Sequence, residues 1–412
     1  MAAMMRKFRT CEYIRKYVFL RKTGKETMNV KERVHAILNY KSCDKMPVVH
    51  FGFWLQTLEK WAQQGHIAAD QAHGWNDGNV IDFEIGKKLG FDFNWFNCFI
   101  SDYTLYPAFE KKVLEELADG SVKVLTEEGV IVLEKKDAVS IPAEIDHLLK
   151  DRKSWEQHYL PRVQFNPNRI LRANVNTATG GLPFNRGGLE YLQTNQSEYP
   201  LGLYCGSLFG TIRNWLGVEG SSYLYMDDEK LFTEIIDTVG NVCFQMIEFI
   251  LKTGLRFDFA HFWEDICYKN GPLIVPSVFN EKVGPHYKRI TQLLGQYGIT
   301  IISLDCDGLI DALIPTWLHN GVNTMFPIEV GTWKASIEPW RQQYGKGIRG
   351  VGGMNKTIFS QDYAAVDAEI ERLKPLVELG GYIPCPDHRI APDAKWENVQ
   401  YYCEKARLAF GG

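Results

Sequence analysis

Five groups of polar residues in this 412-residue chain stand directly after short apolar runs, where a strand of a parallel sheet would end. They are Ser101 and Asp102; His261, Glu264 and Asp265; Asp305, Asp307 and Asp311; Glu329; and Asp387, His388 and Arg389. Like charges gathered in one place raise the cost of ionisation, and a cation or a shared proton relieves it. If these groups meet in space, they indicate either a divalent metal site or a general acid and base pair.

Structural roles account equally well for several of these residues. Asp311 lies near the start of a predicted helix, where an acid stabilises the helix dipole. Asp307 precedes a glycine, which is common turn chemistry. His261 fits a hydrogen-bonded core histidine as well as a functional one, and Asp265 fits a solvated acid. His388 is the hardest of the set to explain as a structural residue.

These groups must be positioned by the strands and helices between them. The chain alternates short apolar runs with amphipathic stretches, which is the pattern of a parallel α/β sheet. The predicted strands are residues 47–51, 96–101, 201–205, 257–261, 300–304, 323–327, 348–351 and 382–384. The strongest predicted helices are residues 227–253, 276–297 and 362–379. Eight strands separated mostly by helices favour a closed TIM-type (β/α)8 barrel, in which the active site lies on the loops that follow the strands.

One region departs from this alternation. Within residues 104–145, three short β-like runs are joined at Asp-Gly and Glu-Gly pairs, which are hairpin signals. They predict a small β-hairpin or meander insertion after the second strand, too small to have a core of its own. Residues 166–185 are rich in Asn, Gly and Pro and predict a long loop near the mouth of the barrel.

The first 27 residues contain eight Lys or Arg against two Glu, so we expect a flexible basic extension there. Residues 28–412 are expected to form the barrel domain, because Asn29 and Glu32 resemble a capping box at the start of a helix. The net charge of -4 and the mixing of both signs along the chain argue against nucleic-acid binding.

Nine cysteines at scattered positions, with no Cys-x-x-Cys pair, argue against a disulfide framework and against a cysteine-only zinc site. Reduced thiols are typical of a cytoplasmic protein, which is the expected location. No run of eighteen or more apolar residues predicts a membrane span. A homodimer is expected only because twofold dimers are the commonest assemblies.

From Met28 to Gly412 the motifs resemble, in their order, the uroporphyrinogen decarboxylase superfamily. Ile100-Ser101-Asp102 is similar to that superfamily's "FSDI" segment. Residues 200–211 resemble its strand of the type "IGFaGgPwTL", and residues 381–399 resemble its C-terminal ending. The resemblance implies a TIM barrel with its site at the strand ends.

Two chemistries occur in that superfamily. True decarboxylases hold the carboxylates of a tetrapyrrole with an Arg-rich loop after the first strand, but residues 50–59 contain no Arg. The other branch comprises corrinoid-dependent methyltransferases, in which a His-x-Cys pair and a later Cys bind zinc. The matching positions here are Asp305, Asp307 and His388. The resemblance is closer to this branch and implies that these three residues bind a divalent metal, expected to be zinc.

The implied function is metal-dependent transfer of a methyl group between a small, methoxylated substrate and a cobalamin on a separate corrinoid protein. Glu264 is expected to be a further ligand or the acid and base, His388 to be catalytic, and Asp102 to be a secondary catalytic candidate. The residues expected to line the substrate pocket are Phe53, Trp54, Trp263 and Glu329. One alternative is a lyase of the decarboxylase type that acts on a tetrapyrrole or a smaller carboxylated substrate. The other is a barrel that binds a small molecule without catalysis.

Overall fold

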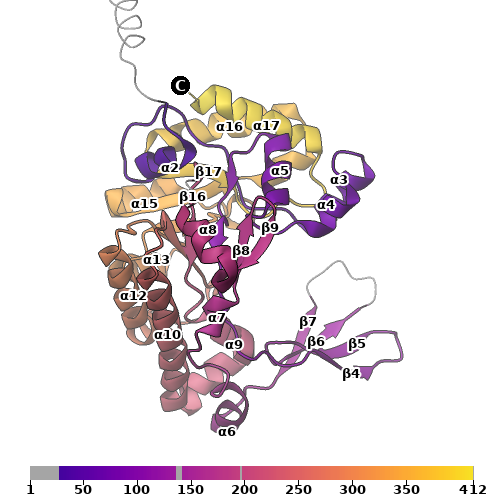
Figure 1. The fold of residues 1–412 in the computed structure, drawn as a ribbon, viewed down its shortest axis with the longest axis vertical. Helices are drawn as coiled ribbons and strands as arrows, with labels where there is room; N and C mark the ends of the chain where they lie inside the picture. The colour runs from indigo at the N-terminus through magenta and orange to yellow at the C-terminus, as the bar shows by residue number, and fades with distance from the viewer. Residues whose placement is uncertain (1–26, 136–141, 195–196, 412) are drawn as a thin grey trace, which may run out of the picture.

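The computed structural model describes residues 27–135, 142–194 and 197–411. The predicted basic extension, apart from Thr27, lies outside these residues. Seven strands form one parallel sheet in the order β17-β16-β15-β14-β11-β10-β3. Their bounds are β3 Cys98–Phe99, β10 Gly202–Tyr204, β11 Phe259–Trp263, β14 Ile302–Asp305, β15 Thr324–Phe326, β16 Arg349–Met354 and β17 Tyr382–Pro386. The fold is therefore a mixed α/β fold built on a parallel sheet (Figure 1).

The first two strands, β1 (Val49–His50) and β2 (Phe93–Asn94), form a separate parallel pair. Each of the eight predicted runs overlaps one strand of the structure, whereas β2 lies outside all of them. At the other end of the arrangement β1 contacts β17, and the chain just after each of them forms an isolated parallel bridge between Phe53 and Ile390. The hydrogen-bonded ladders do not continue around this point, so a closed eight-stranded barrel stays a prediction.

Side chains alternate between the two faces of each strand, and this alternation decides which residues enter the inner core. Phe259 and Ile301 belong to an aromatic-rich cluster with Phe51, Trp95 and Phe326. The side chains of Trp95 and Phe259 stack there with ring centroids 4.4 Å apart. Asp305 stands four residues after Ile301, the residue directly before β14, and therefore lies on the face of this inner cluster.

Helices cover the sheet and connect its strands (Figure 1). They are α2 Val30–Leu38, α3 Leu55–Gln63, α4 Ala69–Gly74, α5 Val80–Leu89, α6 Arg152–Ser154, α7 Asn168–Leu171, α8 Leu189–Thr194, α9 Gly210–Asp227, α10 Glu229–Lys252, α11 Pro276–Val278, α12 Gly284–Gln296, α13 Ile314–His319, α14 Val330–Trp333, α15 Ile337–Tyr344, α16 Tyr363–Glu378 and α17 Trp396–Phe410. The predicted capping box is confirmed, since the side chains of Asn29 and Glu32 each accept the other's backbone N–H. Among the described residues, no helix combines the length and the apolar composition needed to cross a bilayer.

The strands outside the seven-stranded sheet and the β1–β2 pair are short and antiparallel. Strands β4 (Lys112–Glu116), β5 (Val122–Leu125), β6 (Val130–Glu134) and β7 (Ala143–His147) form a four-stranded sheet that projects at the lower right of Figure 1. The predicted range 104–145 contained three runs, and the structure has a fourth strand that ends at His147. A further antiparallel pair, β12 (Cys267–Tyr268) and β13 (Gly271–Pro272), follows β11.

The predicted long loop at residues 166–185 is wrong. This segment contains α7 and a hairpin formed by β8 (Asn174–Thr177) and β9 (Gly180–Pro183). Gly180 has φ of 122°, a conformation that glycine adopts without strain, and this allows the tight return of the chain. The composition that suggested a loop is therefore the composition of a hairpin turn.

Candidate functional site

Three aspartates meet at the carboxyl-terminal edge of the parallel sheet, where β11 and β14 end. Asp265, Asp305 and Asp307 each place one carboxylate oxygen within 4.8 Å of the others. The backbone N–H of Asp307 donates to Asp265 Oδ1 at 3.1 Å, which joins the two loops. Asp265 has φ of 46°, a conformation that non-glycine residues rarely adopt and that often marks functional sites. We call these three residues the aspartate cluster.

His388 and Glu329 lie on the Asp307 side of the aspartate cluster. His388 Nε2 is 3.3 Å from Asp307 Oδ2, and its ring stacks on Trp54 with centroids 5.7 Å apart. Glu329 Oε2 accepts the backbone N–H of Gly308 at 2.5 Å, next to Asp307 in the chain. The structure therefore brings together the predicted residues Asp305, Asp307, His388 and Glu329.

Burial and mutual repulsion disfavour ionisation of these carboxyl groups. Burial, followed by the charges of Asp265 and Asp307, raises the pKa of Asp305 well above its usual range. Burial and the neighbouring Asp307 raise the pKa of Asp265 to about 6. The same two causes raise the pKa of Glu329. A cation among these oxygens would remove the repulsion and favour the ionised forms.

Two buried polar atoms at the site have no hydrogen-bond partner among the described residues. They are Asp307 Oδ1 and His388 Nδ1. Buried polar groups in folded proteins are nearly always paired, so such atoms point to a bound group. Three carboxylates and an imidazole form a donor set that suits a divalent ion such as zinc, manganese or magnesium. The residues present therefore fit a metal ion.

Glu264 has a different role from the predicted one. Its carboxylate accepts the backbone N–H groups of Leu208, Phe209 and Gly210, the Ser207 hydroxyl and the Tyr287 hydroxyl. The side chain is fully buried, so it caps the first turn of α9 and has no oxygen left for a ligand. A Cβ atom at residue 210 would collide with the Glu264 carbonyl oxygen, so glycine is required at this cap. These contacts contradict the prediction that Glu264 is a ligand or the acid and base.

Asp102 lies apart from the aspartate cluster. Its carboxylate accepts the N–H and the hydroxyl of Thr104 at 3.0 and 2.7 Å. Its carbonyl oxygen accepts a hydrogen bond from the buried guanidinium of Arg169, which also donates to the carbonyl of Thr104. These bonds shape the loop after β3. A catalytic role for Asp102 has no support from its contacts with the described residues.

Of the three aromatic residues predicted to line the substrate pocket, one belongs to the core and two lie at the candidate site. Phe53 is buried and packs edge-on against Trp61 and Trp75, so its assignment to the pocket wall is wrong. It belongs to the core because its ring faces α3 and the segment before α5. Trp54 stacks on His388, and Trp263 lies opposite Asp305 in the β11–β14 ladder. These two half-buried rings flank the candidate site.

Asp387 fixes three loops of the site relative to one another. Its Oδ2 accepts the backbone N–H groups of Val330 and Gly331, both at 2.9 Å, and its Oδ1 accepts that of Lys356 at 3.0 Å. The sequence placed Asp387 at a strand end but did not indicate this role. Asp265 was also treated as a solvated acid. Asp265 lies two residues after the end of β11, as Asp307 does after β14, but the predicted strand ended at His261, so this equal spacing was not visible in the sequence.

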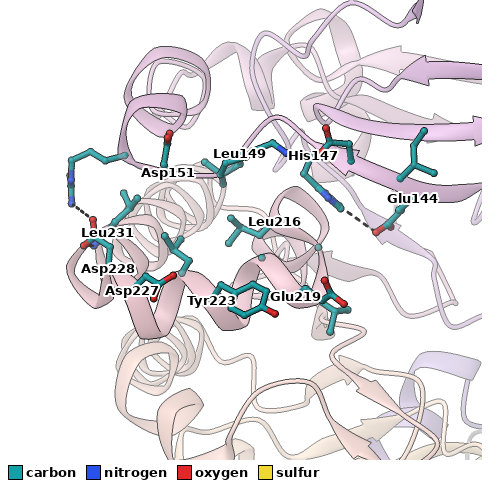
Figure 2. A pocket seen from close by; sticks show the side chains of 18 residues that line it. Glu144, His147, Leu149, Asp151, Leu216, Glu219, Tyr223, Asp227, Asp228 and Leu231 are labelled. Carbon is teal, nitrogen blue, oxygen red and sulfur yellow. Dashed lines mark hydrogen bonds and ion pairs between the residues drawn. The ribbon is translucent and has the colours of Figure 1, made fainter. Parts of the chain in front are cut away.

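A pocket of about 790 Å³ lies between β7 and α9, away from the aspartate cluster (Figure 2). Figure 2 shows His147 beside Glu144, whose Oε2 is 3.5 Å from His147 Nε2. Lys150 pairs with Asp146 at the rim, and the floor contains Leu149 and Leu216 among other apolar residues. None of the predicted site residues lines this pocket, so the candidate chemistry rests on the aspartate cluster.

No protein-family model and no curated protein matches the sequence. The structure is similar to that of a methyltransferase from Methanosarcina mazei, with a TM-score of 0.55 and 12% identity, over 92% of this chain and 99% of that chain. A B12-independent methionine synthase from Shewanella sp. W3-18-1 matches with a TM-score of 0.44 and 10% identity, over 88% of this chain and 98% of that chain. The second similarity is too low to bear on fold or function. The first supports the α/β fold alone.

Replacing Asp265 by Asn should stabilise the metal-free protein, because a carboxyl whose pKa is raised on folding destabilises the fold when it ionises. With the pKa at about 6 in the folded protein, the gain should grow as the pH rises from about 4 and level off above about 6, at about 3 kcal/mol. Asp387→Asn should instead cost about 2 kcal/mol, because an amide cannot accept all three N–H groups. Chemical unfolding in the presence of a chelator measures the change in the free energy of unfolding for both variants. Equal effects of the two variants would contradict this account.

Proposed function

We propose that this chain is a metal-dependent methyltransferase that moves a methyl group between a small methoxylated substrate and a cobalamin carried on a separate corrinoid protein. The metal part of the proposal rests on one observation, the convergence of the three carboxylates of the aspartate cluster beside an unpaired Asp307 oxygen. The methyl-transfer part rests on the resemblance of the sequence motifs to the uroporphyrinogen decarboxylase superfamily.

The proposed ligands are Asp265, Asp305 and Asp307, with His388 as a fourth ligand or as the partner that orients Asp307. Asp265 takes the place that the sequence suggested for Glu264. A divalent ion here would act as a Lewis acid toward the ether oxygen of the substrate. Trp54 and Trp263 flank this position and would enclose the apolar part of the substrate, which excludes water from the reacting bond.

A decarboxylase acting on a polyanionic tetrapyrrole gains no support from the cations near the site. The guanidinium of Arg389 pairs with Asp77 at 2.7 Å and packs over the rings of Phe51 and Trp75. Arg213 donates to the backbone oxygen of Asp265 at 2.8 Å. Arg389 is therefore committed to the protein, and Arg213 gives one N–H to it while its Nε has no partner among the described residues. A substrate with several carboxylates needs several free, bidentate partners.

Metal analysis tests the first half of the proposal. After dialysis against zinc and removal of excess ion, the wild-type protein should retain about one ion per chain. Asp305→Ala and Asp307→Asn should weaken binding at least about tenfold, since each removes a ligand. Glu264→Gln is the matched control, because it should lower the melting temperature while leaving the metal content unchanged. A wild-type protein that retains no more ion than Asp307→Asn would contradict the metal site.

Methyl transfer is tested with free cob(I)alamin and a panel of methoxylated compounds, by following the absorbance change as the corrinoid is methylated. The zinc-loaded protein should accelerate demethylation, and Asp307→Asn should lower kcat/KM by about a hundredfold or more because the substrate oxygen is no longer polarised. Release of carbon dioxide from a carboxylated compound would favour the lyase instead. Saturable binding without turnover of any compound would favour the non-catalytic barrel.

A further inference from the structure

The segment after β17 carries His388 to the site with little support from its own backbone. The residues on either side, Asp387 and Ile390, each donate a backbone N–H, to the end of β16 at 2.8 Å and to the segment after β1 at 3.0 Å. Between them, the backbone N–H groups of His388 and Arg389 have no acceptor among the described residues. The placement of the His388 ring therefore depends on side-chain contacts.

The side chain of Arg389 anchors this segment to the loop before α5. Its Nη2 donates to Asp77 Oδ2 at 2.7 Å, and its Nη1 donates to Asp77 Oδ1 at 3.2 Å. The Arg389 side chain is 25% exposed and that of Asp77 is 18% exposed, so water screens the pair only in part. Two parallel N–H···O bonds fix both the distance and the direction of a guanidinium. The pair is therefore a rigid link between segments 312 residues apart in the chain.

Asp77 is itself held in place from other segments. Asn94, a buried residue of β2, donates its Nδ2 to Asp77 Oδ1 at 2.8 Å, and Asn176 Nδ2 donates to the Asp77 carbonyl at 3.3 Å. Gly52 has φ of 81°, and a Cβ atom there would lie 2.6 Å from Arg389 Nη1 and 2.8 Å from Asp77 Oδ1. Glycine at this position therefore leaves the space that the ion pair occupies.

Arg389 and His388 share an aromatic neighbour. The ring centroid of Phe51 lies 5.5 Å from the Arg389 guanidinium and 5.5 Å from the centroid of the His388 ring. The ring of Trp54 also stacks on His388, with an angle of 16° between the planes. In this position His388 Nε2 lies 3.3 Å from Asp307 Oδ2. Because Arg389 and His388 are consecutive and pack on the same ring, release of Arg389 would displace His388 as well.

We propose that the ion pair of Asp77 and Arg389 positions His388 against Asp307, and that a metal ion at the aspartate cluster binds tightly only while this pair is intact. The second part rests on the proposed function, since it concerns the metal ion of the proposed methyl transfer. Asp77 and Arg389 are positioning residues, because they act through His388. Asp77 also neutralises a guanidinium whose charge would otherwise repel a cation bound beside His388.

Position and charge lead to different outcomes when the pair is broken. If charge alone mattered, Arg389→Met would strengthen zinc binding and Asp77→Asn would weaken it. If position matters, both variants weaken zinc binding, because each releases the segment that carries His388. Loss of a group that orients a metal ligand typically costs about ten- to a hundredfold in metal affinity.

Competition with a coloured chelator measures the zinc affinity of each variant. Arg389→Met, Asp77→Asn and the double variant should each bind zinc about tenfold more weakly than the wild type. The double variant removes both charges, so it leaves no unpaired buried charge and should keep the fold. In a His388→Ala background the same substitutions should change the affinity by less than about twofold, because the pair acts through His388. Tighter zinc binding by Arg389→Met, or an undiminished loss in the His388→Ala background, would overturn the proposal.

The ion pair of Asp92 and Arg407 supplies a matched control. Arg407 Nη2 lies 2.9 Å from Asp92 Oδ1, the side chains are 37% and 20% exposed, and the two residues are 315 positions apart. This pair joins α17 to the residue before β2, at the opposite end of the strands. Asp92→Asn should therefore lower the melting temperature, as Asp77→Asn does, and keep the zinc affinity within about twofold of the wild type. An equal loss of zinc affinity in Asp92→Asn would refute positioning.

The imidazole NMR signal of His388 tests the positioning in the metal-free protein. With isotope-labelled histidine, the signal is assigned by its absence in His388→Ala. It should be the same in the wild type and in Asp92→Asn, and shifted or split in Asp77→Asn and Arg389→Met, because the ring leaves its place beside Trp54. An unchanged signal in these two variants would refute the proposal. A wild-type protein that binds no zinc but shows these shifts would refute the metal site of the proposed function and leave the positioning of His388 standing.

Discussion

The structure depends on how each carboxylate at the carboxyl-terminal edge of the sheet is stabilised. Glu264 and Asp387 are buried and each accepts three backbone N–H groups, so they fix the loops without any cation. The aspartate cluster lacks such a set of donors, although it lies equally deep at Asp305. Glu264 and Asp387 hold the loops in place, whereas burial and mutual repulsion disfavour ionisation of the carboxyl groups in the aspartate cluster.

The carboxylates that accept backbone N–H groups hold the loops on which the aspartate cluster lies. Because Asp387 holds the N–H groups of Val330, Gly331 and Lys356, the loops after β15, β16 and β17 have a fixed relation to one another. Because Glu264 holds the start of α9, the chain after β11 can turn sharply and direct Asp265 inward. Rigid placement of this kind is what a site needs in order to hold reacting groups in a productive geometry.

Much of the fold follows from the sequence, since alternation and helical periodicity mark the seven strands of the main sheet and three of the helical segments. The error at Glu264 has a simple cause. The predicted strand ended at His261, whereas β11 continues to Trp263, and neighbouring residues of an extended chain point to opposite faces. Glu264 therefore faces α9, and the positive φ of Asp265 brings that carboxylate into the cluster. No sequence pattern reports a strained backbone angle or the donors that surround a buried acid.

The same alternation bears on the kind of ion that the site would hold. Cys306 lies between Asp305 and Asp307, but its thiol is buried in the outer core cluster with Cys267, on the face away from the inner cluster. A thiolate is thus close in the chain and turned away from the site. The donors that remain are carboxylates and an imidazole, which make a harder and more strongly Lewis-acidic centre than thiolates do. Such a centre polarises an oxygen substrate better than it activates a thiol, which for the proposed methyl transfer favours an ether or an alcohol over a thiol as the methyl carrier.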